Sequence, residues 1–146
     1  MVTVIIPALN EAKTIGNIIQ FCLNNSLVKE VIVVDDNSED STISIAAAAG
    51  AKVIRSKIRG KGISMREGIQ KAEQEILIFL DGDIDPYPED TINLLISPII
   101  NDEADFVKAT FARNAGRVTE LVAKPLLNIY FPGLSGFSQP LSGMIA

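Results

Sequence analysis

Residues 75–83 read Glu-Ile-Leu-Ile-Phe-Leu-Asp-Gly-Asp, an apolar run that ends in two carboxylates. A continuous apolar run of this length, followed by turn residues, is typical of a strand buried on both faces of a parallel sheet. In an open parallel sheet, ligands are bound at the carboxyl ends of the strands. The stretch therefore predicts a central strand that delivers the loop Asp81-Gly82-Asp83 to the functional edge of a sheet.

Four further stretches are predicted to be strands, and helices alternate with them. The strands are expected at residues 2–6, 31–34, 52–55 and 105–110, and the helices at about 15–22, 42–49 and 61–72, from 88, and from 116 or 117. This alternation predicts an α/β fold of the Rossmann-like type, a mostly parallel sheet with helices on both faces. The length of 146 residues predicts one domain, 1–146.

Local signals support the predicted helices. The first helix is expected to bury four apolar residues at i, i+3, i+4 and i+7, namely Ile15, Ile18, Ile19 and Cys22. Residues 40–42 offer N-cap oxygens to the second helix, and Gly50 stands where a C-terminal glycine belongs. Pro88 suits the first position of the fourth helix, and Pro125 is expected to kink or split the last one.

The composition excludes several classes of protein. Apolar residues make up 47% of the chain, which is enough for a packed core and excludes a disordered chain. The formal charge is −5, so a nucleic-acid partner is not expected. With no histidine, neither a Ser-His-Asp triad nor a histidine-based zinc site can be assembled. The P-loop motif is absent, and no G-x-G-x-x-G follows the first strand.

Cysteine usage and the chain ends predict the setting of the protein. Cys22 is the single cysteine and is expected to be a small buried apolar residue, which fits a cytoplasmic location. We expect no signal peptide and no membrane span, since every apolar stretch is far shorter than the ~20 residues that cross a bilayer. Residues 139–146 end on apolar side chains. We therefore expect a chain cut short inside a larger fold, and association through its apolar end, as in a homodimer.

Three polar segments directly follow predicted strands, at residues 7–11, 35–38 and 81–83. Parallel strands end at one edge of a sheet, so the three segments are expected to meet there. Glu11 is placed to fix a loop around a base, and the Asp35-Asp36 pair offers acceptors to a base N–H or a ribose hydroxyl. The alternative for each segment taken alone is ordinary turn or capping chemistry.

The Asp81-Gly82-Asp83 segment suggests a cation. Two carboxylates one residue apart repel each other unless a cation is near, and their hard oxygens suit Mg²⁺ or Mn²⁺. Such an ion completes its coordination with substrate phosphates and offsets charge that develops on a leaving diphosphate. Gly82 lets the backbone approach a ligand closely. The alternative is a solvated acidic turn before the next helix.

Two basic segments are candidates for anion binding. The glycines of Arg59-Gly60-Lys61-Gly62 free backbone amides at a helix start, and Lys61 can reach an anion. Residues 116–119 bring amides, the Arg117 guanidinium and a hydroxyl to another helix start, which suits a phosphate or carboxylate. The alternatives are a flexible surface loop and an ordinary helix start with Arg117 in solvent.

The order of three motifs resembles a known family. Val-Ile-Ile-Pro-Ala-Leu-Asn-Glu (4–11), Val-Val-Asp-Asp-Asn-Ser-Glu-Asp-Ser-Thr (33–42) and Phe-Leu-Asp-Gly-Asp (79–83) resemble the opening half of GT-A glycosyltransferases of the family 2 type. Gly60-Lys61-Gly62, Val107-Lys108, residues 116–127 and Gln139-Pro140-Leu141 resemble glucosyl-3-phosphoglycerate synthases and their mannosyl relatives in particular. The resemblance covers nearly the whole chain and implies the GT-A fold, with this chain as the N-terminal part of a longer one.

The resemblance also implies a site, residue by residue. Nine residues would bind the nucleotide sugar: Pro7, Ala8, Leu9, Glu11, Asp36, Lys61, Asp81, Gly82 and Asp83. Of these, Asp81 and Asp83 would take part in catalysis, and Asp83 would be the ligand of Mg²⁺ or Mn²⁺. Four residues would bind the acceptor: Gly116, Arg117, Thr119 and Leu141. Asp36 departs from the subgroup, which often has serine at this position.

The implied activity is that of a hexosyltransferase. It would move glucose or mannose from a nucleotide-diphosphate sugar, with UDP-glucose favoured, to a small phosphorylated acid, 3-phosphoglycerate. A polyprenyl-phosphate sugar transferase, a nucleotidyltransferase and a nucleotide-binding fragment without full activity are the alternatives. The loop between Lys108 and Gly116 is shorter than in the subgroup, and the resemblance places a histidine metal ligand beyond residue 146.

Overall fold

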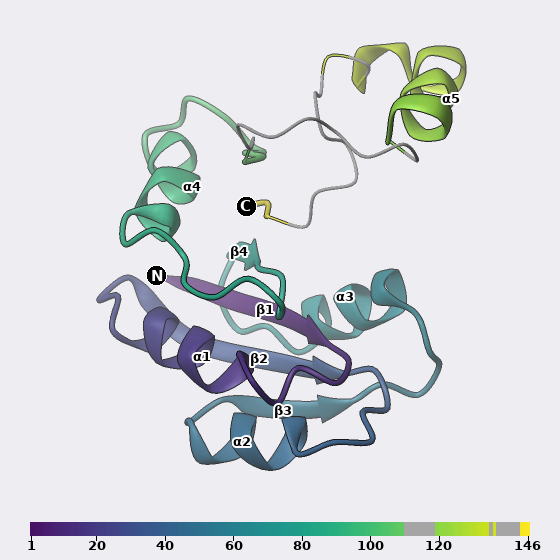
Figure 1. The fold of residues 1–146 in the computed structure, drawn as a ribbon. Helices are drawn as coiled ribbons and strands as arrows, with labels where there is room; N and C mark the ends of the chain where they lie inside the picture. Colours follow the sequence, from purple (N-terminus) through teal and green to yellow (C-terminus); the bar gives the residue numbers. More distant parts are fainter. Residues whose placement is uncertain (110–118, 135, 137–143) are drawn as a thin grey trace.

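A four-stranded sheet lies at the centre of the computed structural model, which describes residues 1–109, 119–134, 136 and 144–146 (Figure 1). Its strands are β1 (Val2–Ala8), β2 (Val28–Asp35), β3 (Lys52–Arg55) and β4 (Ile76–Phe79). They are ordered β3-β2-β1-β4, and every pair is parallel. In register, Ile5 of β1 pairs with Ile32 of β2 and with Phe79 of β4. The predicted parallel sheet is confirmed.

Helices cover both faces of this sheet, as the sequence predicted. These are α1 (Ile15–Leu23), α2 (Thr42–Ala48), α3 (Lys61–Ile69) and α4 (Thr91–Ile100). Val4 and Ile6 point into the larger core cluster, which includes residues of α1, α2 and α4. Ile5, between them in sequence, belongs to a second cluster against which Met65 of α3 packs. The alternation along β1 therefore divides the core into two layers.

The predicted signals hold for α1 and for the end of α2. At its start, the N-cap Ser41 makes no side-chain capping hydrogen bond, and the Thr42 amide donates to Asp40 Oδ1 (2.9 Å). The four residues of the i, i+3, i+4, i+7 pattern in α1 are all buried. Helix α2 ends at Ala48, and Gly50 follows with φ of +97°, a backbone conformation that glycine adopts without steric cost. Helix α3 begins at Lys61, as predicted, but ends at Ile69.

Two predicted elements differ from the structure. Pro88 is not the first residue of α4, because residues 88–91 form a turn closed by the Thr91 amide on the Pro88 carbonyl (3.0 Å), and the helix begins at Thr91. Residues 105–109 do not form a strand. In their place Lys108 makes an isolated antiparallel bridge with Ile145, which also bridges to Phe79 of β4. Thr110 lies outside the described residues.

The last helical segment is divided in two, as Pro125 predicted. A π-helical stretch (Thr119–Ala123) leads into α5 (Lys124–Tyr130), with Pro125 in the first turn of α5. The predicted start of this helix, near Gly116 or Arg117, lies outside the described residues. None of the residues of α5 is buried, and Figure 1 shows the helix standing away from the sheet. A short 3-10 helix follows at Pro132–Leu134.

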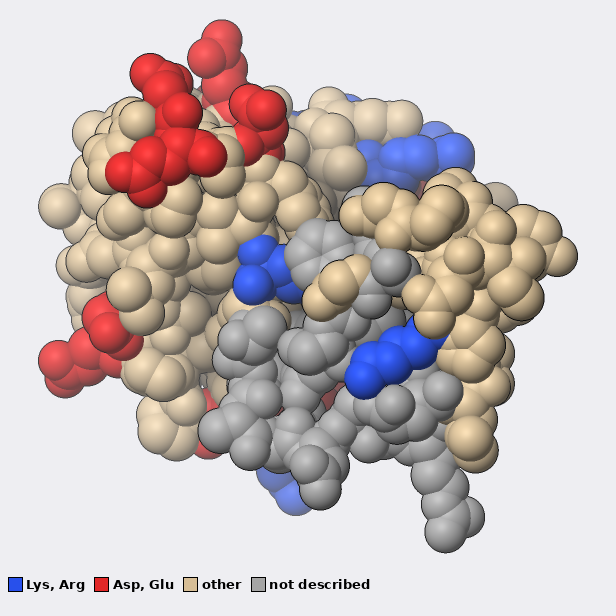
Figure 2. All heavy atoms as spheres, turned by 90° about the horizontal axis from the view of Figure 1, so that it is seen from above, with Lys and Arg blue, Asp and Glu red and all other residues tan. Residues whose placement is uncertain are grey.

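Charged side chains are unevenly spread over the face seen in Figure 2, where acidic residues gather at one end and the drawn lysines and arginines lie apart from them. In the part of the chain that the structure describes, no helix combines the length and the apolar character that a membrane span requires.

Candidate nucleotide-sugar site

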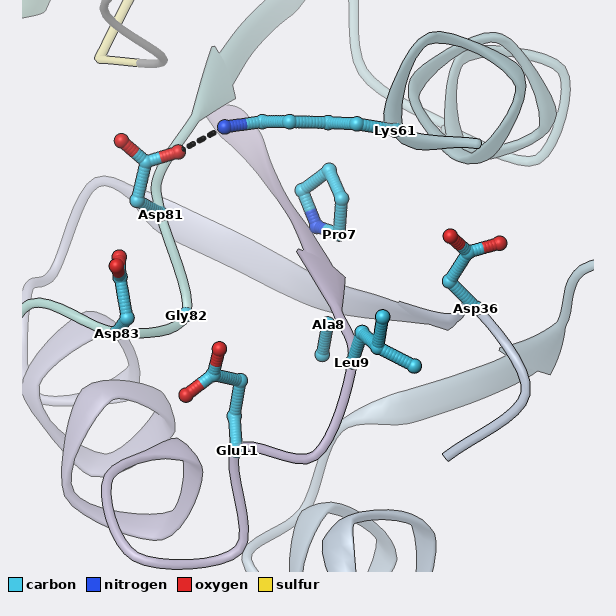
Figure 3. Close-up of a pocket in the computed structure, with 9 residues that line it drawn as sticks. All are labelled: Pro7, Ala8, Leu9, Glu11, Asp36, Lys61, Asp81, Gly82 and Asp83. Carbon is cyan, nitrogen blue, oxygen red and sulfur yellow. Dashed lines mark hydrogen bonds and ion pairs between the residues drawn. The ribbon is translucent and has the colours of Figure 1, made fainter. Parts of the chain in front are cut away.

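The carboxyl ends of β1, β2 and β4 meet at a pocket of about 220 Å³ (Figure 3). It is lined by the end of β1 and the loop that follows it, the residue after β2, the first residue of α3 and the turn after β4. The lining residues are Pro7, Ala8, Leu9, Glu11, Asp36, Lys61, Asp81, Gly82 and Asp83. These are the nine residues that the resemblance implied for the nucleotide sugar. The structure brings all of them together, and their role in binding stays a prediction.

Side chains that follow β2 hold the loop that follows β1. Ser38 Oγ accepts a hydrogen bond from the Asn10 amide (2.9 Å), and Thr42 Oγ1 accepts one from the Glu11 amide (2.8 Å). Asn10 has φ of 59°, a left-handed conformation that asparagine tolerates. The Asp40 carboxylate in turn accepts from the Thr42 hydroxyl, which lowers the pKa of Asp40. The polar segment after β2 therefore shapes the pocket wall besides preceding α2.

The Asp81-Gly82-Asp83 turn is fixed through its backbone. The Tyr87 hydroxyl accepts from the Asp81 amide and donates to the Asp81 carbonyl, each at 2.9 Å. Thr14 Oγ1 donates to the Gly82 carbonyl at 2.6 Å. A Cβ atom on Gly82 would lie 3.2 Å from Glu11 Cγ. Glycine at this position therefore allows the turn to pack closely against the β1 loop.

A lysine and an aspartate face each other across the mouth of the pocket. The Lys61 side chain extends from the start of α3 toward Asp81, and its Nζ donates to Asp81 Oδ1 (Figure 3). The side chain of Lys61 is 55% exposed and that of Asp81 is 18% exposed. Ion pairs at this level of exposure contribute little to stability. The pair matters for its position, because it places a cation beside the pocket.

Glu11 and Asp83 add negative charge on the opposite wall. The pKa of Glu11 is raised, first by burial and then by the charges of Asp83 and Asp40, and the hydrogen bond with Thr14 opposes this rise. Asp83 is exposed. The negative charge of Asp83 beside Glu11 therefore marks a place where a cation is favourable.

The donor set fits a divalent ion that shares its coordination with a substrate. Among the described residues, no three acidic, histidine or cysteine side chains gather in an arrangement that could hold a metal ion. Mg²⁺ in particular takes one or two carboxylates from a protein and completes its shell with waters and substrate phosphates. Asp83 is the carboxylate available for such an ion, because Asp81 forms an ion pair with Lys61.

The last residue of β2, Asp35, and the residue after it, Asp36, differ in their contacts. The Asp35 side chain is fully buried and accepts from the Ser38 amide at 3.2 and 3.3 Å, with Arg55 Nε at 3.8 Å. Asp36 lines the pocket, and both of its carboxylate oxygens accept from the Gly60 amide. Of this predicted pair, only Asp36 is therefore placed at the site.

Tyr87 and Lys108 are residues of the site region that sequence reasoning missed. Lys108 lies half-buried on the bridge beside β4. Its pKa is lowered, first by burial and also by Lys61, while the charge of Asp81 opposes the change. Val107-Lys108 was noticed as part of a resemblance, but no chemistry was attached to it. Tyr87 could not be identified from the sequence, because its hydroxyl bonds to backbone atoms of Asp81, which no side-chain pattern reveals.

The predicted acceptor residues mostly lie outside the described residues. This applies to Gly116, Arg117 and Leu141. The backbone of Thr119 opens the π-helical stretch, and its side chain is not described. The acceptor assignment therefore stays a prediction.

The sequence of this chain matches one protein family over most of its length. A model of the family described as "Glycosyl transferase family 2" aligns with residues 3–139. The chain belongs to glycosyl transferase family 2. The motifs at 4–11, 33–42 and 79–83, from which this membership was predicted, all fall within the matched segment.

Named relatives of this family 2 chain include a "Glucosyl-3-phosphoglycerate synthase" of Petrotoga mobilis. The two are 35% identical over 165 aligned positions, which take in 96% of this chain and 51% of the relative. The alignment has more positions than this chain has residues, so the relative carries insertions. The chain spans about half the length of the relatives it matches.

Solved structures of similar proteins support the GT-A fold. One is glucosyl-3-phosphoglycerate synthase from Mycobacterium tuberculosis in complex with Mn²⁺, UDP-glucose and phosphoglyceric acid, with a TM-score of 0.89 and 34% identity over 99% of this chain and 55% of that one. Another is mannosyl-3-phosphoglycerate synthase from Rubrobacter xylanophilus, with a TM-score of 0.90 and 32% identity over 99% and 52%. The resemblance to this subgroup is therefore confirmed.

Proposed function

We propose that this chain carries the donor site of a hexosyltransferase that moves glucose or mannose from a nucleotide-diphosphate sugar to 3-phosphoglycerate. The proposal rests on the pocket at the ends of β1, β2 and β4. Backbone atoms, the side chain of Lys61 and the carboxylates of Asp81 and Asp83 lie together there. The names of the relatives and of the ligands in their structures favour UDP-glucose, a divalent ion and phosphoglycerate.

In this proposal each wall of the pocket contacts a different part of the donor. The backbone and side chains of residues 7–9 face the nucleoside, and Lys61 lies beside the diphosphate. Asp83 would hold Mg²⁺ or Mn²⁺, which when bound offsets negative charge on the diphosphate. Asp81 holds Lys61 and lies where the sugar meets the diphosphate.

The reaction breaks the bond between the anomeric carbon and the diphosphate oxygen, and the electron pair stays with the diphosphate. The hydroxyl oxygen of the acceptor forms the new bond to that carbon. Its proton can pass to the departing diphosphate, so the transfer requires no side-chain base. Lys61 would stabilise the charge that develops on the leaving group.

The acceptor side of the proposal rests on residues 116–119 and Leu141. The glycine, arginine and threonine of this segment offer amide, guanidinium and hydroxyl donors, which suit the phosphate and carboxylate of a small acid. The names of the relatives support the same acceptor. For the full product of the gene we propose a Mn²⁺- or Mg²⁺-dependent cytoplasmic enzyme that acts as a homodimer.

Calorimetry tests the donor site on the chain itself. UDP and GDP are titrated in Mn²⁺ into the wild type, into Asp83→Ala and into Asp90→Ala, an exposed carboxylate that makes no capping hydrogen bond at the start of α4. We expect Asp83→Ala to weaken nucleotide binding roughly tenfold or more and Asp90→Ala to leave it unchanged. Equal binding by all three variants would rule out the metal role of Asp83. Failure of the wild type to bind either nucleotide would rule out the donor site.

Transfer is tested with radiolabelled UDP-glucose and GDP-mannose and the full product of the gene. 3-Phosphoglycerate and a polyprenyl phosphate are supplied in separate reactions. We expect label in a small acidic product and release of a nucleoside diphosphate. If label entered only the lipid, the acceptor would be a polyprenyl phosphate and not 3-phosphoglycerate. Release of pyrophosphate would indicate a nucleotidyltransferase.

A further inference from the structure

Thr14 occupies the N-cap position of α1 but does not use its side chain to cap the helix. A threonine there ordinarily accepts a hydrogen bond from an amide two or three residues further on, which satisfies a helix amide that has no partner within the helix. The Thr14 hydroxyl instead donates to the carbonyl of Gly82 at 2.6 Å, across a separation of 68 residues in the sequence. The side chain that the helix start would ordinarily engage therefore holds the acidic turn after β4.

The same residue belongs to the loop that carries Glu11. The Thr14 amide (3.1 Å) and the Ile15 amide (3.0 Å) both donate to the Glu11 carbonyl, and the Thr14 hydroxyl lies 3.3 Å from that oxygen. These contacts close a tight turn that leads into α1 at Ile15. A hydroxyl has one proton to donate, and its shorter contact is the one to Gly82. Thr14 therefore links the loop after β1 to the turn after β4.

Gly82 is the point at which these two segments meet. It is buried, and a buried backbone carbonyl requires a donor. A Cβ atom at this position would lie 3.2 Å from Glu11 Cγ and 3.5 Å from the Pro7 carbonyl oxygen. Asp83 is the next residue, and Figure 3 shows the Glu11 side chain directed toward this part of the turn. The position of Asp83 relative to Glu11 therefore depends on the contacts of Gly82.

The carboxylates of Glu11 and Asp83 oppose the close packing of the two segments. Burial and then the charge of Asp83 raise the pKa of Glu11, so the two groups repel each other when both are ionised. The bond from the Thr14 hydroxyl to the Gly82 carbonyl joins two uncharged groups. It resists separation of the segments without neutralising either carboxylate, and so it keeps in place the negative charge that attracts a cation.

We propose that Thr14 is a positioning residue, whose bond to the Gly82 carbonyl holds Asp83 beside Glu11 and sets the affinity of the site for a divalent cation. The inference rests on the proposed function, in which Asp83 is the ligand of the ion. Loss of the hydroxyl then raises the concentration of cation that the site requires and leaves the rest of the pocket intact. Serine can replace threonine because it keeps the donor, whereas valine keeps the branched shape and removes the donor.

A first experiment requires no ligand. Amide hydrogen exchange is measured by NMR at Asp81, whose amide donates to the Tyr87 hydroxyl, and at Ile18, whose amide donates to the Thr14 carbonyl. Thr14→Val is expected to speed exchange at Asp81 about two- to tenfold, the scale of one hydrogen bond, and to leave Ile18 unchanged. Thr14→Ser should match the wild type at both amides. Unchanged exchange at Asp81, or an equal rise at Ile18, would overturn the proposal.

A second experiment measures how much Mn²⁺ is needed for UDP to bind, by calorimetric titration of UDP at a series of Mn²⁺ concentrations. Thr14→Val is expected to raise the Mn²⁺ concentration for half-maximal binding roughly tenfold, and to bind UDP within about twofold of the wild type once Mn²⁺ is saturating. Thr14→Ser should match the wild type throughout. An unchanged Mn²⁺ requirement, or a loss that persists at saturating Mn²⁺, would overturn the proposal. If the wild type binds no UDP at any Mn²⁺ concentration, the proposed function fails, and the exchange experiment still decides the role of Thr14.

A double-mutant cycle separates positioning from general damage to the fold. In a chain that already carries Asp83→Ala, Thr14→Val is expected to cause no further loss of UDP affinity at limiting Mn²⁺, since the two residues act through one bound ion. Additive losses would show independent action and contradict the inference. Cooperative urea unfolding of each variant establishes that it is folded.

Discussion

The Tyr87 hydroxyl bonds to both backbone polar groups of Asp81, accepting from the amide and donating to the carbonyl at 2.9 Å each. Burial, and then the charge of Asp81, raise the pKa of Tyr87, so the hydroxyl keeps its proton and remains a donor. Its ring stacks on Phe21 of α1 with centroids 5.7 Å apart. One buried side chain thus ties the first residue of the acidic turn to the core.

Replacement of Tyr87 by phenylalanine keeps the ring and removes the hydroxyl. The amide and carbonyl of Asp81 lose their partner, which costs about 1–3 kcal/mol of unfolding free energy. We expect a lower urea midpoint and weaker UDP binding. Tyr130→Phe is the matched control, because Tyr130 is 68% exposed, and its effect should lie within about 0.5 kcal/mol. Identical midpoints for the two variants would show that the hydroxyl contributes nothing.

Substitution by alanine is predicted to have opposite effects on stability at two glycines of α3, Gly62 and Gly68. A Cβ on Gly68 would lie 2.5 Å from Ile5 Cγ2, and Ile5 is fully buried, whereas a Cβ on Gly62 has no atom within 4 Å. We expect Gly68→Ala to destabilise the chain by about 1–3 kcal/mol through overpacking. Gly62→Ala should stabilise it by up to about 1 kcal/mol through helix propensity. Urea unfolding measures both, and equal effects would refute the close contact of α3 with β1.

The raised pKa of Glu11 makes stability depend on pH. Its ordinary value is 4.5, and the folded chain holds the proton more tightly than the unfolded chain does. The stability that this group contributes is therefore full below the unfolded pKa and is lost as the pH rises through the folded pKa. Glu11→Gln should melt at a higher temperature than the wild type at neutral pH, with a difference that shrinks below about pH 4.

Thermal unfolding of both chains across this pH range checks the Glu11 prediction. A Glu11→Gln variant that melts lower at neutral pH would show that the carboxylate is stabilising and that the sign is reversed. Glu89→Gln, at an exposed position, is the control for removal of one negative charge. It should change the melting temperature little at any pH.

Cys22 is predicted to be unreactive in the folded chain. Burial raises the pKa of its thiol to about 12, so almost no thiolate is present at mildly alkaline pH. An aromatic disulfide reagent should label nothing in native buffer and one thiol per chain in denaturant, since the chain has a single cysteine. Rapid labelling without denaturant would contradict its burial in α1.

The strands and helices were largely predictable, because their signals are local. The apolar runs at 2–6 and 75–80 and the spacing in α1 follow directly from the sequence. The predicted strand at 105–110 failed because its pairing depends on Ile145, far away along the chain. The start of α4 was misplaced because a proline suits a turn and a helix start equally well.

The candidate site was predictable in its members but not in its contacts. Parallel strands end at one edge, so the loops after β1, β2 and β4 had to meet. No sequence pattern indicated that the Tyr87 hydroxyl forms hydrogen bonds with the backbone of Asp81, or that the Asp36 carboxylate accepts from the Gly60 amide. These contacts depend on how far each side chain reaches in the folded chain, and spacing alone does not encode that reach.

Because β1 lies between β2 and β4 in the sheet, it cannot be paired on both sides until both of those strands have been synthesised. β1 leaves the ribosome before the other strands, yet its second neighbour, β4, is complete only at residue 79. The pocket requires Asp83 as well, so shorter nascent chains have no binding site to fill. A nucleotide can stabilise only a state that binds it. Any folding of a nascent chain that ends before Asp83 therefore receives no stabilisation from the nucleotide.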